Sequence, residues 1–430
     1  MSLQIIRLNS LAARVALAGV AIFCLAGGWF SSRWDIAASV ASRGLDVREP
    51  SSRQLAEWMT DTASDDPYAW ATVGRYFEKT FEPDDLARSL TSYEKAAALS
   101  PNNYIFWLRL GGARDRSGEQ GTAEAAYRRA LYLAPNYAAV RWAYGNALIR
   151  HSKTDEGFSN VAAAAAADPI YAYPAAAVAL QAFKGNADET RRLLGGGPDI
   201  DAAITDVFCS QRKFSEALDA WSRLGPEDKL VRFKDVGARL LLRTIDAHET
   251  RIAATVYGDL ADSDAAKPMV GQILNGGFEQ AVKLRNAGLF DWEIAEGSEP
   301  QIGLSDSVSH AGKYSMWLTF NSFEAASFRS VSQRVAVAPG ATYIFDGFYR
   351  ADIKSKAAFK WQIVDIISGG ELGVTEPLAL NGDWASMRAR FTVPANSDGV
   401  IVTFIRTGCG GGACPVTGKI FFDDLSLKRE

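Results

Sequence analysis

The sequence is poor in the residues that build metal centres, disulfide frameworks and nucleic-acid interfaces. Its 430 residues include 4 cysteines and 3 histidines, and no histidine has a second ligand at metal-binding spacing. Lysine and arginine together number 46, against 50 aspartates and glutamates, so the net charge is -4 and no basic excess is available for phosphate backbones. We therefore expect neither a zinc site nor a nucleic-acid partner.

Catalytic motifs are missing as well. The histidines at 151, 248 and 310 lie in separate contexts, and none has a nucleophile motif nearby. We predict that the protein is not an enzyme. A pair of carboxylates for glycoside hydrolysis stays open as a minor alternative, because several aspartates fall in the second half of the chain.

The few cysteines include one closely spaced pair. Cys409 and Cys414 flank a Gly-Gly-Gly-Ala loop that is flexible enough to bring two sulfur atoms together. This arrangement predicts a short disulfide in an oxidising compartment, with two free thiols as the alternative. Cys24 and Cys209 lie in helical contexts without a partner nearby in the sequence.

Residues 15–32 form an uncharged run near the N-terminus. As a helix this run would be about 27 Å long, close to the thickness of a bilayer core. Arginines precede it, and Trp29 and Trp34 occupy positions typical of interfacial aromatics. We predict a transmembrane anchor over 15–32 with residues 1–14 in the cytoplasm. A cleaved signal peptide is the alternative, and arginines after the run leave the orientation open.

Prolines at a fixed spacing organise the next part of the chain. Pro101, Pro135 and Pro169 stand 34 residues apart, each at the end of an alanine-rich helical pattern, and Pro67 falls on the same frame. Such a spacing predicts stacked helical hairpins. Apolar residues recur at spacings of three and four throughout, so we expect a helical repeat domain over residues 45–266.

The middle repeat is the most regular. Its packing positions carry large or very small residues, namely Trp107, Leu110, Gly111, Ala123, Tyr127, Ala130 and Pro135. Here the chain resembles the tetratricopeptide repeat, whose signature positions are met at seven of eight offsets. The resemblance implies a solenoid with a protein partner on its concave side. The candidate partner-binding residues are Arg114, Arg128, Tyr144 and Arg150.

The composition changes near residue 268. Glycine, serine, threonine, valine and aromatic residues replace the alanine-rich helices, and short alternating runs appear, the clearest over 342–350. Seven or more such runs separated by turn residues predict an antiparallel β-sandwich over residues 268–430. The fold class is therefore multidomain α plus β: a transmembrane helix, a helical solenoid and a C-terminal sandwich.

Residues 268–430 contain four short motifs, at 274–279 (LNGGFE), 310–315 (HAGKYS), 339–343 (PGATY) and 422–427 (FDDLSL). Together they resemble the jelly-roll carbohydrate-binding modules of families 4 and 9, which are of the galactose-binding-like type. The resemblance implies a jelly roll, and less specifically sugar binding, since a fold does not fix a function.

Two carboxylates in these motifs are candidate metal ligands. Glu279 would come within reach of Asp424 if the first and last strands pair, and two carboxylates with backbone carbonyls can hold calcium. The resembled modules commonly carry a structural calcium near these ends. The alternative is that Glu279 and Asp424 accept hydrogen bonds from turns.

Strand alternation indicates a candidate glycan surface. Over 342–350 it sends Asp346, Phe348 and Arg350 to one face and apolar residues to the other. Charged groups beside an aromatic ring suit a sugar, whose hydroxyls need donors and acceptors and whose C–H face packs on a ring. We expect Gln362 and Arg406 to join them, with Trp361 or Trp292 as the stacking platform. A solvated face with an Asp346 to Arg350 salt bridge is the alternative.

These predictions combine into one functional hypothesis. We expect a membrane-anchored adaptor of the bacterial inner membrane, with its main body in the periplasm, that binds a protein through the repeats and a glycan through the sandwich. Cell-envelope or exopolysaccharide assembly is the expected setting. The alternatives are a pure protein scaffold whose jelly roll binds no sugar and a glycan-active enzyme. The sequence names no oligomeric state.

Overall fold

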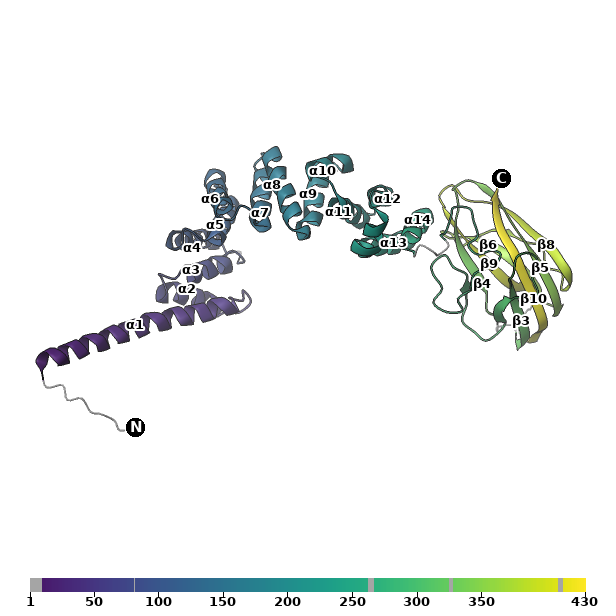
Figure 1. The fold of residues 1–430 in the computed structure, drawn as a ribbon, viewed down its shortest axis with the longest axis horizontal. Helices are drawn as coiled ribbons and strands as arrows, with labels where there is room; N and C mark the ends of the chain where they lie inside the picture. The colour runs from purple at the N-terminus through teal and green to yellow at the C-terminus, as the bar shows by residue number, and fades with distance from the viewer. Residues whose placement is uncertain (1–9, 81, 262–266, 325–327, 409–412) are drawn as a thin grey trace, which may run out of the picture. The chain divides into compact units, whose positions relative to one another are not determined.

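The computed structural model describes residues 10–80, 82–261, 267–324, 328–408 and 413–430. Within these ranges the chain is helical as far as Leu260 and forms β-strands from Glu293 onward (Figure 1). The predicted multidomain arrangement, helical first and antiparallel β last, is confirmed. Contacts divide the chain into two compact units, Met1–Gly196 and Gly197–Glu430, which are described separately below.

The first helix, α1 (Leu11–Arg43), is long and largely apolar. It begins where the Ser10 side chain accepts the Ala13 N–H, and it ends at Gly44, whose φ of 74° stops the helix. Among the described residues it is the one helix long and apolar enough to cross a membrane, by length and composition alone. It continues beyond the apolar run, and Ala37 near its end is buried in a small core with Ala56 and Met59.

Hairpins of short helices make up the rest of this first unit. The helices are α2 (Ser52–Thr62), α3 (Pro67–Phe77), α4 (Asp85–Leu99), α5 (Tyr104–Arg116), α6 (Gln120–Leu133), α7 (Ala138–Arg150), α8 (Thr154–Ala167), η1 (Pro169–Tyr171), α9 (Ala172–Ala182) and α10 (Ala187–Leu193). The helices α4, α6 and α8 each end two residues before a repeat proline, which cannot continue a helix. The regularly spaced prolines therefore separate successive helical hairpins, as predicted.

Small residues set how closely the paired helices approach. A Cβ atom added to Gly111 in α5 would lie 2.9 Å from the Tyr127 ring of α6. A Cβ atom on Gly145 in α7 would lie 2.8 Å from the carbonyl oxygen of Gly157 in α8. The glycines thus let aromatic rings and backbones pack where any side chain would collide.

The second unit begins with another group of helices, α11 (Pro198–Ser210), α12 (Phe214–Ser222), η2 (Asp228–Arg232), α13 (Lys234–Asp246) and α14 (Thr250–Leu260). Trp221 of α12 is fully buried and fills the space above Gly237 of α13. Its indole N–H donates to Asp259 at 3.0 Å, so the polar atom of this core ring is satisfied.

The strands of the second unit form two facing antiparallel sheets. They are β1 (Glu293–Ile294), β2 (Gln301–Ser305), β3 (Ser315–Glu324), β4 (Val331–Ala336), β5 (Thr342–Lys354), β6 (Ala358–Asp365), β7 (Glu371–Val374), β8 (Asn381–Thr392), β9 (Gly399–Thr407) and β10 (Ala413–Arg429). Within the described residues the orders are β1-β4-β9-β6-β7 and β2-β3-β10-β5-β8. Inward side chains of both sheets share one apolar core that includes Phe345, Trp361, Phe404 and Phe422. The predicted sandwich is confirmed.

Helix α14 and the sandwich contact one another within this unit. The Asp398 carboxylate accepts the backbone N–H groups of Thr250 and Arg251 at 2.7 and 3.0 Å. Ala253 and Ala254 of the same helix share a small apolar cluster with Phe290 and Ala336 of the sandwich. The last helix of the helical part is therefore packed on the β-sandwich.

Candidate functional site

The outward side chains of three neighbouring strands form the candidate site. Strand β5 contributes Asp346, Phe348 and Arg350, which alternate with core residues as predicted. The register sets Ser426 of β10 and Arg388 of β8 on either side of Asp346. We call the outward residues of these strands the β5 face; they are Asp346, Phe348, Arg350, Ser386, Arg388, Ser426 and Lys428.

A surface cavity of about 670 Å³ lies over the β5 face. Its lining includes Asp346, Phe348, Arg388 and Lys428, and thus combines an acid, an aromatic ring and two cations. Arg350 lines a neighbouring cavity of about 560 Å³. Side chains of this kind offer hydroxyl-rich ligands both hydrogen-bond donors and acceptors.

Asp346 is held in place by its neighbours on β10. Lys428 Nζ donates to one carboxylate oxygen at 2.9 Å, and the Ser426 hydroxyl donates to the other. Burial raises the pKa of Asp346, but the hydrogen bonds from Ser426 and Lys428 outweigh it and leave the pKa below its ordinary value. Asp346 is therefore ionised at neutral pH. It does not pair with Arg350, which instead lies 3.7 Å from Asp383.

An aromatic group adjoins the cavity through Phe348, which lines it. The His310 ring stacks on Phe348 with 3.7 Å between ring centroids and an interplanar angle of 12°. Trp384 meets His310 edge-on at 5.5 Å, and His310 Nδ1 lies 2.7 Å from an Asp424 oxygen. His310 and Phe348 lie face to face while Trp384 stands at an angle to them, so the β5 face has an aromatic group beside its charged groups.

Three of the six predicted glycan residues do not belong to this surface. Trp361 is fully buried among core aromatics, so it offers no platform to a ligand. Gln362 points outward from the opposite sheet, where its side chain donates to Glu371 at 2.7 Å. Arg406 has the inward parity of Val402 and Phe404 on β9 and lies over the Phe328 ring at 5.3 Å, where burial lowers its pKa. The prediction that these three join Asp346 is corrected on this geometry.

Three of the four motifs, those at 274–279, 310–315 and 422–427, meet at one turn. Asp423, which is fully buried, accepts the backbone N–H groups of His310 and Ala311 through one oxygen at 2.8 and 3.2 Å. Glu279 accepts those of Lys313 and Tyr314 at 2.8 and 3.1 Å. The turn that positions His310 over Phe348 is therefore fastened by carboxylates from both ends of the domain.

The proposed calcium ligands are occupied by this turn. Glu279 binds backbone N–H groups and Asp424 binds His310, which matches the alternative stated for them. Gly312 lies so close that a Cβ atom there would be 2.1 Å from a Glu279 oxygen. Among the described residues no group of three or more His, Cys, Asp and Glu side chains could hold a metal ion. Both carboxylates therefore have hydrogen-bond partners in the described residues, and a calcium site that adds backbone carbonyls to this pair stays a prediction.

The predicted disulfide falls partly within the described residues. Cys414 is buried at the start of β10 and is disulfide-bonded, whereas Cys409 lies outside the described residues. Cys24 and Cys209 are free thiols.

The four candidate partner-binding residues are engaged within the helical stack. Arg114 pairs with Glu94 at 2.9 Å, and Arg150 pairs with Asp115 of the preceding hairpin. Arg128 bonds the Tyr144 hydroxyl at 3.3 Å, and Tyr144 itself is only 2% exposed. Tyr144 is thus a core residue rather than a contact surface, and the arginines join neighbouring helices.

Comparisons with known proteins place the chain in no family. No family model matches it. The peroxisomal targeting signal receptors of Saccharomyces cerevisiae and Candida glabrata are each 26% identical to it, over 98 and 97 residues. These segments make up 23% of this chain and 16% of each receptor, so the match spans about one sixth of the receptors' length.

Solved structures give distant matches to parts of the chain. A CBM4 structure has 18% identity and a TM-score of 0.28, and covers 37% of this chain and 99% of its own. TmCBM61 in complex with β-1,4-galactotriose has 18% identity and a TM-score of 0.27, with the same coverage. A MamA RS-1 ArsTM double mutant has 15% identity and a TM-score of 0.33, and covers 42% of this chain and 96% of its own.

Sequence reasoning missed several residues of the β5 face. The alternation of 386–392 and of the last strand sends Ser386, Arg388, Ser426 and Lys428 to one side, but only the strand register shows that this side is shared with Asp346. His310 begins the motif at 310–315, and nothing in its local pattern indicates that it stacks on Phe348, 38 positions further along the chain.

Proposed function

We propose that the protein is a membrane-anchored adaptor without catalytic activity, whose sandwich binds glycan on the β5 face and whose helical repeats bind a protein partner. The observation that carries this proposal is the cavity over Asp346, Phe348 and Lys428, in which paired charges adjoin a stacked aromatic group. Sugar hydroxyls require such donors and acceptors, and the C–H face of a sugar packs on an aromatic ring.

We propose the cell envelope of a bacterium as the setting, with helix α1 in the inner membrane and the main body in the periplasm. The length and composition of α1 support an anchor. The bonded Cys414 supports an oxidising compartment, because disulfides rarely persist in a reducing cytoplasm. We propose exopolysaccharide or envelope assembly as the process, because it would use a tether, a protein partner and a glycan together.

A glycan array probed with the full-length protein in detergent tests the sandwich half of the proposal. We expect binding to a polysaccharide fragment, weakened about tenfold in Phe348→Ala through loss of ring contact. Lys360→Ala, which changes a side chain on the outer face of the opposite sheet, is the matched control and should bind normally. A loss in Gln362→Ala with none in Phe348→Ala would place the site on that opposite sheet instead.

A pure protein scaffold is the second candidate. It is favoured by one observation: Asp346, Asp424 and His310 all have partners inside the domain, so the β5 face is satisfied without a ligand. In that case the array shows no signal for neutral or acidic polysaccharides, while a peptide partner still binds the helical unit. Turnover of a labelled oligosaccharide would contradict both candidates and indicate an enzyme.

A further inference from the structure

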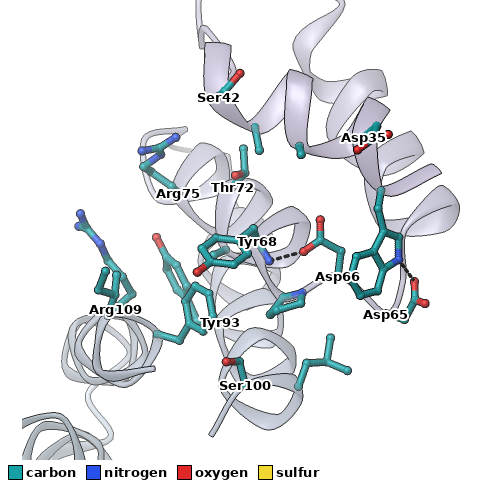
Figure 2. A pocket seen from close by; sticks show the side chains of 18 residues that line it. Asp35, Ser42, Asp65, Asp66, Tyr68, Thr72, Arg75, Tyr93, Ser100 and Arg109 are labelled. Atoms are coloured by element: carbon teal, nitrogen blue, oxygen red, sulfur yellow. Dashed lines mark hydrogen bonds between the residues drawn. The ribbon is translucent and has the colours of Figure 1, made fainter. Parts of the chain in front are cut away.

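A second cavity, of about 840 Å³, lies in the first unit between the end of α1 and the helices α3, α4 and α5 (Figure 2). Its walls carry large apolar side chains that the fold leaves uncovered. Tyr68 is 58% exposed, Trp34 48%, Ile105 44% and Leu99 43%. Exposed apolar side chains gathered in one concave region are typical of a binding site rather than of a solvated surface.

The two ends of this cavity carry opposite charges. Arg75 and Arg109 lie at one end, and Asp35, Asp65 and Asp66 lie toward the other, as Figure 2 shows. Within the part of the chain that the structure describes, neither arginine has a carboxylate within ion-pair distance, and both are exposed. This contrasts with Arg114 and Arg150, whose charges are already paired.

The acidic end also retains capacity to bind. Asp66 caps α3 by accepting the Tyr68 N–H at 2.8 Å, and Asp65 accepts the Trp34 indole N–H at 3.3 Å. Asp35 has no partner within the described residues and is exposed. A cation placed here would meet up to three carboxylates, and an anion would be repelled.

This charge pattern discriminates between occupants. An acyl chain or phospholipid has a single polar end, so one end of the cavity would remain uncompensated. A peptide segment can present an acidic residue, several apolar residues and a basic residue in order. We propose that this cavity binds such a bipolar segment of a protein partner, with its acidic end on Arg75 and Arg109 and its basic end on Asp35 and Asp65. The inference rests on the proposed adaptor function and names its partner surface.

Its place in the chain adds one consequence. Trp34 lies two residues beyond the apolar run over 15–32, so a membrane-embedded α1 would set the acidic end of the cavity next to the bilayer surface. The partner segment would then lie close to the membrane with its basic end toward the lipid.

A library of random peptides displayed on phage and selected on the full-length protein in detergent tests this inference. The wild type should enrich peptides with acidic and basic ends separated by apolar residues. In Arg75→Glu/Arg109→Glu the enriched peptides should instead carry basic residues at both ends. A synthetic peptide from the wild-type pool should bind that variant about tenfold more weakly by fluorescence anisotropy, as expected for losing a close charge pair.

Control variants separate the site from the fold. Lys95→Glu reverses an exposed cation of α4 that does not line the cavity, and should bind the wild-type peptide normally. Arg75→Gln/Arg109→Gln removes the charges without adding repulsion, and should weaken binding while circular dichroism stays unchanged. If the enriched peptides bind both double variants as tightly as the wild type, this site is overturned but the adaptor proposal stands. No enrichment over an unrelated membrane protein would overturn both.

Discussion

Asp398, in a loop of the β-sandwich, caps helix α14 by accepting the backbone N–H of Thr250 at 2.7 Å. The first turn of a helix has N–H groups without partners, and Glu249 at the N-cap provides no side-chain bond of its own. The Asp398 carboxylate supplies that bond from 148 residues away. Gly399 beside it permits the contact, since a Cβ atom there would lie 2.2 Å from the Thr250 hydroxyl.

Removing this cap should destabilise the second unit. We expect Asp398→Ala to lower its free energy of unfolding by about 1 kcal/mol, the usual cost of losing a helix N-cap. Asp398→Asn keeps one acceptor and should lose less. Urea unfolding followed by tryptophan fluorescence measures the change, and Asp306→Ala, which alters an exposed aspartate, is the control. Equal stability of Asp398→Ala and the wild type would show that the contact is not formed in solution.

Asp346 should make stability depend on pH. Its pKa in the folded protein lies below the ordinary value of 3.8, so the ionised carboxylate favours the folded state at neutral pH. This contribution should fade as the pH falls below about 4 toward the folded pKa. Asp346→Asn should therefore be less stable than the wild type at pH 7, and the difference should shrink at pH 3. A difference that is constant or grows on acidification contradicts the assignment.

Close packing between α7 and α8 should make Gly145 intolerant of any side chain. We expect Gly145→Ala to lower the midpoint of thermal unfolding, with a cost of about 1–3 kcal/mol for overpacking against the Gly157 carbonyl. Gly121 in α6 has nothing within 4 Å of an added Cβ atom. Gly121→Ala should therefore be neutral or stabilise by up to about 1 kcal/mol, as alanine favours helix. Equal effects of the two substitutions would argue against this packing.

Calcium should have little effect on the sandwich. Glu279 and Asp424 already bind the turn that contains His310. We therefore expect the unfolding temperature of the second unit, which contains the sandwich, to be the same in excess calcium and in EDTA. Differential scanning calorimetry on the full-length protein measures it. A calcium-dependent increase that disappears in Glu279→Gln would restore the metal site suggested by the family resemblance.

The elements of the fold could be predicted from the sequence because their signals are local. The proline spacing marks the ends of α4, α6 and α8, and strict alternation marks β5 and the direction of Asp346, Phe348 and Arg350. These patterns need only the geometry of one helix or one strand.

The site could be predicted only in part, because its remaining residues depend on how separate strands align. Arg406 of β9 points inward and Gln362 of β6 points outward, and both strands belong to the sheet that faces the sheet of β5. The sequence alone does not show which strands share a sheet, so it could not separate these residues from Asp346. The capping role of Asp398 could not be predicted either, because it depends on a loop contacting a helix that lies 148 residues earlier in the chain. The charged cavity beside α1 likewise requires the end of that helix to pack on α3.

The hydrogen bonds between Asp398 and α14 also connect the sandwich mechanically to that helix. A polymer held on the outside of β5 would exert force on the sandwich, and the helix it caps would take up that force through two hydrogen bonds and the apolar cluster around Phe290. If the β5 face binds a polysaccharide as proposed, tension along that polymer would be transmitted to α14 through these contacts.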